Sequence, residues 1–524
     1  MDIDSLLASQ NPDDLRALAL KLLSEIQARE AVVSSLRADL ERQAQENQAQ
    51  TRYIRQLEEA LENARRWRFG HKSDAFHGEQ RELFDEDIDA DAADITRQLV
   101  AQLPGAAAHK PERPKRRPLS PLLPRQDSLL APATDICPRC GHALRFIRDE
   151  VSERLEYAPD RFIVHRHIRP QLGCPRCDIV VSAPLPAQLI ETGQPGPGLL
   201  ARVVCAKALD HLPLYRQRDI YQRGGADISR STLAGWFGAV GAALRPLAEA
   251  LHRDLLRHSV LQADETPLLL LDAVRGKSQR GYLWAYVTVQ DAGRVIVLYD
   301  CQPGCGGHYA REVLKGWHGT LVVDGNAGRR ALFDLSRVTE AGCLAHVRRK
   351  FSEPLTANPS PVVKHALNIL RGLYQLERTI EARPAVKKRR WRQRYAKPQM
   401  EAFHQWLLLQ QSQAVPHSRL SKALDYTLNR WPALVRYLED GRLPIDNNHC
   451  ENLMRPVAAG RKNRLFAGSL RAGQRLAAIL SLLETARLNG HDPYLWLREV
   501  LARLPDWPGN RISELLPYAE NRFD

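Results

Sequence analysis

The sequence predicts a multidomain protein of the α/β class. Three observations support this prediction: a heptad pattern of apolar residues near the N-terminus, two Cys-x-x-Cys pairs on either side of strand-like runs, and a change from helical to strand-like periodicity after His258. The chain has 524 residues, which is enough for several domains and at least one large core.

Composition narrows the class of partner. Lys and Arg number 75 against 61 Asp and Glu, a formal net charge of +14. This excess favours a polyanion, most commonly nucleic acid, although a merely basic soluble protein has the same balance. We find no apolar run of membrane-spanning length, no basic start typical of a signal peptide, and an odd count of nine cysteines. We therefore expect an intracellular protein with no membrane contact.

Residues 1–69 are predicted to be helical and to contain a coiled coil. Apolar residues recur in a heptad frame, with Ile26, Val33, Leu40, Asn47, Ile54 and Leu61 at one core position and Leu22, Leu36, Leu57 and Ala64 at the other. Arg29, Gln43 and Gln50 are weak members of the second position. Such a seam must be buried against another helix, and an asparagine within it favours a parallel dimer. The alternative is one amphipathic helix packed on its own domain. We expect a homodimer or a larger assembly.

Residues 70–132 are interpreted as mostly linker. They contain an acidic run, DEDIDADAAD, and a basic proline-rich run, HKPERPKRRP. Charge blocks and proline give no basis for a packed core.

Residues 133–184 are predicted to form a zinc-binding β module. CPRC occurs twice, and the runs RFIRDEVSERLEY and RFIVHRHIRPQLG between the two copies alternate like a β-hairpin. Two thiolates from each knuckle complete a tetrahedral, structural zinc site, whose ligands are Cys137, Cys140, Cys174 and Cys177. A redox pair or chance is the alternative.

Residues 185–256 look helical, with a Gly-Gly break before DISRSTLAGWF. A helix, a glycine turn and a capped second helix resemble a helix-turn-helix, although many ordinary helical hairpins have the same pattern. In that arrangement Arg230, Ser231 and Thr232 would face DNA.

After His258 the pattern predicts an α/β core of the ribonuclease-H kind, residues 257–353 and 443–490. SVLQADETPLLLLD, GYLWAYVTV and RVIVLYD are strand-like, GTLVVDGNAG is a fourth strand, and GCLAHVRRKF is interpreted as a fifth. Asp264 lies within the first strand and Asp324 ends the fourth. Carboxylates on apolar strands are costly unless paired or metal-bound. A third acid from a late helix would complete a site for two Mg²⁺ or Mn²⁺ ions.

Glu451 is the candidate third acid. Asp446 resembles a helix N-cap, Pro456 is expected to end or kink the helix, and a salt bridge from Glu451 to Arg455 is the alternative reading. A set of nearby cations is predicted to contact DNA phosphates: Arg348, Arg349, Lys350, Arg461, Lys462 and Arg464. Residues 354–442 are read as a helical insertion, whose Trp391 and Tyr395 stack either on an unpaired base or on each other. Residues 491–524 are a C-terminal helical segment.

Several long motifs resemble the insertion-sequence 66 transposases of the Asp-Asp-Glu class: ADETP, VVDGNAG, CLAHVRRKF, IDNNHCENLMRPVAAGRKNRLFAGS, the paired CPRC knuckles, RFGHKSD, DHLPLYRQRDIYQRGGADISRSTLAGW and SLLETARLNGHDPYLWL. The resemblance covers nearly the whole chain and implies Asp264, Asp324 and Glu451 as the metal-binding triad. One departure is DGNAGRR, where the family usually has aromatic residues.

The resemblance implies a bacterial, nucleoid-associated cytoplasmic transposase. It would cleave element ends with metal ions and join the 3′-hydroxyls to target DNA, with double-stranded DNA and accessory proteins of the same element as partners. Two alternatives remain open: a zinc-dependent DNA-binding regulator with an inactive nuclease-like core, and a nuclease of the same fold that cuts branched DNA.

Overall fold

A computed structural model describes residues 12–69, 79–102, 118–158, 161–190, 195–272, 277–289, 293–325, 333, 338–357, 361–460 and 468–518. The chain divides into two compact units, Met1–Asn63 with Ile95–Pro111 and Ala64–Asp94 with Glu112–Asp524. None of the described helices is both long enough and apolar enough to cross a membrane.

The first unit is built on one long helix. Helix α2 (Pro12–Phe69) has 58 residues, and the C-terminal part of α3 (Glu79–Gln102) lies beside it, because Tyr53 Oη donates to Gln98 Oε1 at 2.9 Å. The predicted helix is therefore confirmed. Leu36 and Leu40 of the predicted seam are 56% and 66% exposed, so a single chain leaves this part of the seam uncovered, and the coiled coil stays a prediction.

The linker prediction is wrong for α3. The acidic run that suggested a solvated tether is helical, and Glu86, Asp91 and Asp94 are buried. Lys207 pairs with Glu86, and Arg475 with Asp91. Buried carboxylates are tolerated because cations from distant parts of the chain neutralise them.

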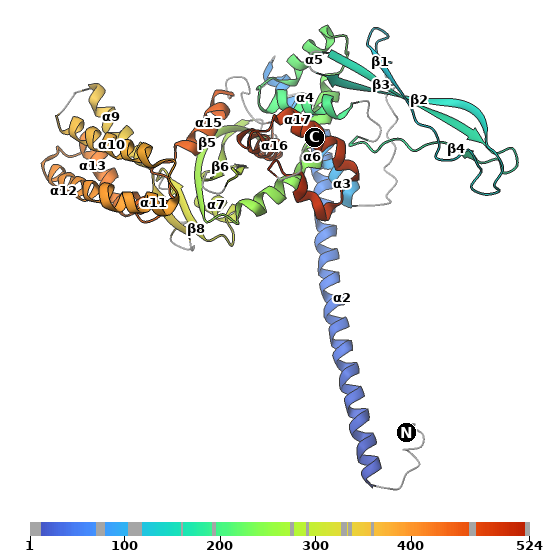
Figure 1. Ribbon diagram of the computed structural model, residues 1–524, viewed down its shortest axis with the longest axis horizontal. Helices are drawn as coiled ribbons and strands as arrows, with labels where there is room; N and C mark the ends of the chain where they lie inside the picture. The colour runs from blue at the N-terminus through green and yellow to red at the C-terminus, as the bar shows by residue number, and fades with distance from the viewer. Residues whose placement is uncertain are drawn as a thin grey trace. The chain divides into compact units, whose positions relative to one another are not determined.

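The predicted β module forms as a long hairpin (Figure 1). Strands β2 (Arg145–Ala158) and β3 (Arg161–Gly173) pair antiparallel from Arg145↔Gly173 to Ala158↔Arg161. Strand β1 (Arg125–Leu129) pairs parallel with β3, and β4 (Val180–Val181) pairs antiparallel with it. The hairpin brings the two knuckles together at one end of the strands.

Three helices follow, and the last is longer than the helix-turn-helix reading requires. These are α4 (Pro197–Ala208), α5 (Leu214–Arg223) and α6 (Arg230–Leu255). Gly225 has φ +83° in the turn before α6, a conformation that glycine adopts without strain. Ser229 caps α6 by accepting from Thr232 N. Phe237, Leu244 and Leu251 of α6 are buried in the main core, so α6 is a core helix along much of its length.

The central sheet has five strands in the order β7-β6-β5-β8-β9. Strands β5 (Val260–Asp272), β6 (Lys277–Thr288) and β7 (Val297–Gln302) are antiparallel, whereas β8 (Gly319–Val323) and β9 (Val338–Gly342) run parallel to β5. Four strands lie where the sequence predicted them.

The predicted fifth strand is wrong. Strand β9 ends at Gly342, and most of GCLAHVRRKF belongs to helix α9 (Leu344–Ala357). Leu344, Val347 and Phe351 are fully buried at a spacing of three and four residues, which is the helical period.

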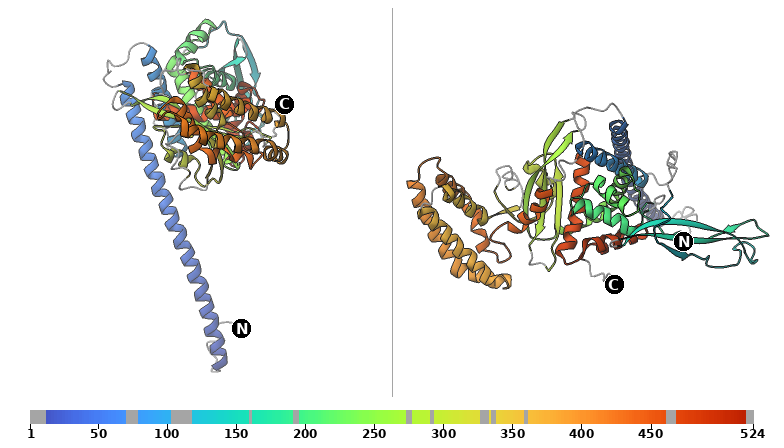
Figure 2. Two further views of the ribbon diagram at one scale, coloured as in Figure 1. Left: turned by 90° about the vertical axis from the view of Figure 1, so that its left-hand side faces the viewer. Right: turned by 90° about the horizontal axis from the view of Figure 1, so that it is seen from above.

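Helices cover the sheet on both sides (Figures 1 and 2). On one side lie the helices of the predicted insertion, and Leu370, Phe403 and Leu424 from these helices share a core with Val260 and Val322 of the sheet. The elements of the insertion are α10 (Pro361–Ile380), α11 (Ala385–Trp391), a π-helical turn (Arg392–Ala396), α12 (Lys397–Gln413), α13 (Arg419–Asn429) and α14 (Trp431–Leu434). On the other side lie α6, α16 (Leu470–Leu488) and α17 (Pro493–Arg503). A short helix, α7 (Gly307–Val313), precedes β8, and α15 (Asn448–Gly460) follows the insertion.

Candidate functional site

Asp264 and Asp324 lie just beyond the paired residues of two neighbouring strands. The parallel pairing of β5 with β8 ends at Gln262 and Val322. Asp264 lies two residues further along β5, and Asp324 directly follows β8. Val322 is fully buried in the core beneath the insertion, whereas both aspartates are only partly buried.

Two features hold the backbone at Asp324 and Gly325. Tyr426 Oη donates to the carbonyl of Asp324. Gly325 has φ +88° and packs against the guanidinium of Arg430, so a larger residue here would be strained and would displace the arginine.

Glu451 lies in the first turn of α15 and is tethered to β5. Asn447 Nδ2 donates to the carbonyl of Ala263 at 2.9 Å, and Gln262 Nε2 donates to the carbonyl of Asp446 at 2.9 Å. Asp446 also accepts from Asn448 N, which agrees with its predicted capping role. The two strand residues just before Asp264 therefore hold the start of the helix that carries Glu451. Pro456 lies inside α15 and does not end it.

His346 of α9 lies between Asp324 and Glu451. Its Nε2 is 3.9 Å from Asp324 Oδ2, and its Nδ1 is 3.4 Å from Glu451 Oε1. Arg349, one turn further along α9, donates to Glu451 Oε2 at 3.0 Å and to His346 Nε2 at 3.3 Å. Glu451 therefore pairs with Arg349 of α9, and the predicted alternative partner was Arg455. The structure brings Asp324, His346 and Glu451 together, with Asp264 on the adjoining strand.

Sequence reasoning gave no role to Cys343, which the structure adds to this group. Its Sγ is 3.2 Å from His346 Nδ1 and accepts from Asn447 N at 3.2 Å. Burial raises the pKa of the Cys343 thiol to about 12, which keeps it protonated near neutrality. Glu451 Oε1 is buried and accepts no hydrogen bond from the described residues. The only signal in the sequence was the Cys-x-x-His spacing, which places both side chains at the start of one helix.

The predicted DNA-contacting residues differ in exposure. Arg348 and Arg349 are exposed on α9, and the Arg348 guanidinium lies 5.2 Å from the Tyr374 ring. Lys350 is half-buried. Arg461, Lys462 and Arg464 lie outside the described residues.

The predicted recognition residues on α6 are only partly open to a ligand. Ser231 and Thr232 are exposed, but the Arg230 guanidinium pairs with Asp85 of α3 at 3.2 Å. In the insertion, the Trp391 and Tyr395 rings lie 5.1 Å apart. This contact matches the alternative in which the two rings pack on each other.

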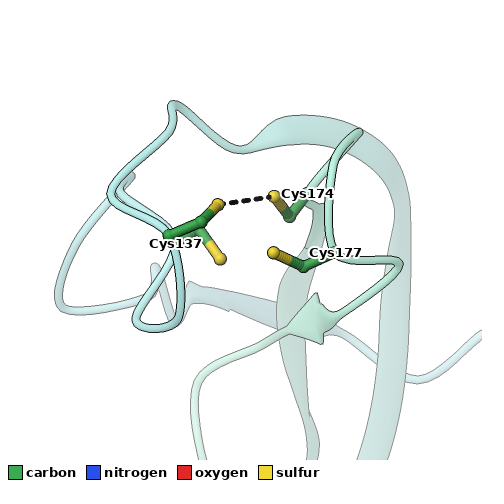
Figure 3. A group of neighbouring side chains, drawn as sticks. Cys137, Cys174 and Cys177 are labelled. Atoms are coloured by element: carbon green, nitrogen blue, oxygen red, sulfur yellow. Dashed lines mark hydrogen bonds between the residues drawn. The ribbon is translucent and has the colours of Figure 1, made fainter.

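The four knuckle cysteines form one cluster. Figure 3, in which Cys137, Cys174 and Cys177 are labelled, shows the sulfur atoms directed toward a common centre. With Cys140, all four Sγ atoms lie within 4.8 Å of one another, and all four are free thiols. The backbone N–H of Arg139 lowers the pKa of Cys137 to about 7, because it stabilises the thiolate. Four sulfur ligands in one place fit a closed structural zinc site.

Comparisons with known proteins identify the family. A family model described as "Transposase IS66 family" matches residues 192–475, the IS66 C-terminal element matches 481–518, the zinc-finger binding domain of transposase IS66 matches 134–178, and a model named "Transposase C of IS166 homeodomain" matches 56–127. Among curated relatives, the uncharacterized protein y4qI of Sinorhizobium fredii is 31% identical, with 97% of each chain covered. The uncharacterized protein y4jD of the same organism is 33% identical, covering 82% of this chain and 85% of its own. This chain therefore belongs to the IS66 transposase family.

Proposed function

We propose that this protein is a DNA transposase that cuts element ends and joins their 3′-hydroxyls to target DNA in a ribonuclease-H-like core. The observation that supports the proposal is the packing of Asp324 and Glu451 on either side of His346. In addition, Asn447 and Gln262 tie the helix of Glu451 to the strand that carries Asp264. Three antiparallel strands followed by two parallel ones support the ribonuclease-H-like assignment.

The donor set fits Mg²⁺ or Mn²⁺. Asp264, Asp324 and Glu451 would hold the ions through carboxylate oxygens, the ligands that hard divalent cations prefer. Glu451 Oε1 is buried without a hydrogen-bond donor, which leaves a costly unsatisfied acceptor that a cation would relieve. When bound, two such ions activate the attacking oxygen and stabilise the leaving oxygen.

The surrounding cations would position the DNA backbone. Arg349 donates to Glu451 Oε2, and its exposed guanidinium would turn toward a DNA phosphate. His346 lies between the two acids and would orient the scissile phosphate. Water first attacks the phosphodiester at the element end and releases a 3′-hydroxyl. That hydroxyl then attacks a target phosphodiester in line and displaces a target 3′-oxygen.

The test is a strand-transfer assay with Mg²⁺ on double-stranded DNA carrying element ends. Asp264→Asn should lose cleavage by about 10³-fold or more, because several kcal/mol of charge stabilisation are lost. Asp272→Asn, at the other end of β5, is the matched control and should retain activity. Full cleavage by Asp264→Asn would end the triad assignment. Binding without cleavage by the unaltered chain would favour the regulator, and cutting of branched DNA without joining would favour the resolving nuclease.

A further inference from the structure

Beside the proposed catalytic acids lies a second group of donors of a different chemical kind. Cys343 Sγ, His346 Nδ1 and Glu451 Oε1 lie within 4.8 Å of one another. The sulfur is 3.2 Å from the imidazole nitrogen, and that nitrogen is 3.4 Å from the carboxylate oxygen. The three donors come from the start of α9 and the first turn of α15, two elements held together at Asn447, whose backbone N–H donates to Cys343 Sγ.

These separations match a tetrahedral zinc site. With Zn–S near 2.3 Å and Zn–N or Zn–O near 2.0 Å, neighbouring ligand atoms in a tetrahedron lie about 3.3–3.6 Å apart. The sulfur–nitrogen and nitrogen–oxygen separations are both within about 0.4 Å of that range, so a cation could enter with side-chain shifts of a few tenths of an ångström.

The chemistry selects a borderline or soft ion. A thiolate and an imidazole favour Zn²⁺, Co²⁺ or Cd²⁺ and are poor ligands for Mg²⁺. The other ring nitrogen of His346, Nε2, accepts from Arg349 at 3.3 Å and lies 3.9 Å from Asp324 Oδ2. The imidazole proton therefore lies on Nδ1, the nitrogen that faces Cys343 and Glu451. A cation would replace the protons of Nδ1 and of the Cys343 thiol.

We infer that Cys343, His346 and Glu451 form an inhibitory site for a thiophilic divalent cation such as Zn²⁺. Binding there removes Glu451 Oε1 from the Mg²⁺ site, so the inhibitory role rests on the proposed function, whereas the binding itself does not. This site is distinct from the structural zinc site, which uses the four knuckle cysteines.

Binding is tested on the full chain with its knuckle site filled by zinc. Co²⁺ is the probe, because a thiolate ligand gives it a sulfur-to-metal charge-transfer band. The unaltered chain and Cys205→Ser, a control at another buried cysteine, should take up about one further equivalent of Co²⁺ with this band. Cys343→Ser should lose the band, and serine keeps an acceptor for Asn447 N. His346→Ala should lower the Co²⁺ affinity by at least about tenfold. An identical band in all four proteins, or no band in the unaltered chain, overturns the site.

Inhibition is tested separately. In the Mg²⁺-dependent cleavage assay, added Zn²⁺ should slow the unaltered chain by at least about tenfold, and Cys343→Ser, compared with its own uninhibited rate, by less than about twofold. Equal inhibition of both proteins overturns the inhibitory role. A chain that binds Co²⁺ through Cys343 but never cleaves DNA overturns the proposed function and leaves the metal site standing.

Discussion

Glu451 illustrates how a single residue is held before any ligand arrives. Its carboxylate pairs with Arg349, whose side chain is 53% exposed. The Glu451 side chain is 13% exposed, but the arginine side chain of the pair is more than half exposed, and water therefore screens the interaction. The pair stabilises by about 1 kcal/mol or less, so a divalent cation can compete with it. The Arg349 guanidinium nevertheless neutralises part of the Glu451 carboxylate charge that would attract a metal ion.

Arg349→Ala should therefore strengthen Mn²⁺ binding in the absence of DNA by about two- to fivefold, the equivalent of a pair worth up to about 1 kcal/mol. Mn²⁺ titration followed by electron paramagnetic resonance measures this. Arg348→Ala, at the neighbouring exposed arginine that lies over Tyr374, should leave the affinity nearly unchanged. Unchanged or weaker binding by Arg349→Ala would contradict the competition.

The buried charge of Glu86 stabilises the contact of α3 with α4 and the start of α5. Its side chain is fully buried, and it accepts from Lys207 Nζ at 3.0 Å and from the backbone N–H groups of Leu214 and Tyr215. Glu86→Ala leaves the buried Lys207 with only the more distant Asp87, at 3.9 Å, and removes the acceptor of the Leu214 and Tyr215 N–H groups. The loss should cost about 3–5 kcal/mol of unfolding free energy. Urea denaturation followed by tryptophan fluorescence gives the value.

The control for Glu86 is Glu499→Ala, which removes a half-exposed partner of Arg503 on α17. This substitution should change stability much less, because water solvates the arginine left behind. Equal losses in the two variants would show that burial of the Lys207 pair is not what stabilises the α3 region.

Among the elements, the zinc hairpin has one end held by metal ligands and one end held by packing. The knuckles lie at one end of β2 and β3, whereas Leu155, Phe162 and Val164 at the other end share a core with Leu199 and Leu233 of the helices. Zinc binding contributes its free energy to the folding of the residues around the metal site. The other end of the hairpin has a hydrophobic core of its own, so it should stay folded without the metal ion.

Chelation of zinc should therefore raise amide hydrogen exchange at the knuckles and at the adjoining strand ends, while the Leu155–Val164 pairing stays protected. Cys177→Ser should reproduce the effect without a chelator. Uniform loss of protection along both strands would mean that the whole hairpin depends on the metal ion. Unchanged exchange at the knuckles would remove the structural role of zinc.

The elements also show where sequence patterns succeed. Strands such as β8 were predictable because a short apolar run that ends in a polar turn is typical of a buried strand. Helix α3 was not predictable from its sequence. Its buried acids are stabilised by Lys207 and Arg475, which are distant in the sequence and leave no sign in the local pattern. In the site, the carboxylates Asp264 and Asp324 could be found from their cost on apolar strands. The contact between Cys343 and His346 could not, because the apolar spacing of α9 was misread as a strand.

At the scale of the whole molecule, α2 is the element that a single chain leaves incomplete. Val33, Leu36 and Leu40 are 47%, 56% and 66% exposed along one heptad seam. A contiguous exposed apolar stripe on a long helix indicates a partner helix. A second copy of the same chain would supply an identical seam, and would also bring two proposed catalytic cores to two element ends.

We expect the double substitution Leu36→Asp and Leu40→Asp to convert a dimer into monomers, because charges in the seam repel and cannot be desolvated. Sedimentation equilibrium at several concentrations measures the mass. Leu122→Asp, at a leucine that is 93% exposed outside α2, is the control and should stay dimeric. The monomer should also keep DNA cleavage at single ends while losing paired joining, because the sheet that carries Asp264 and Asp324 is built without α2. A monomeric unaltered chain, or a dimer that survives the double substitution, would show that the seam of α2 does not join two chains.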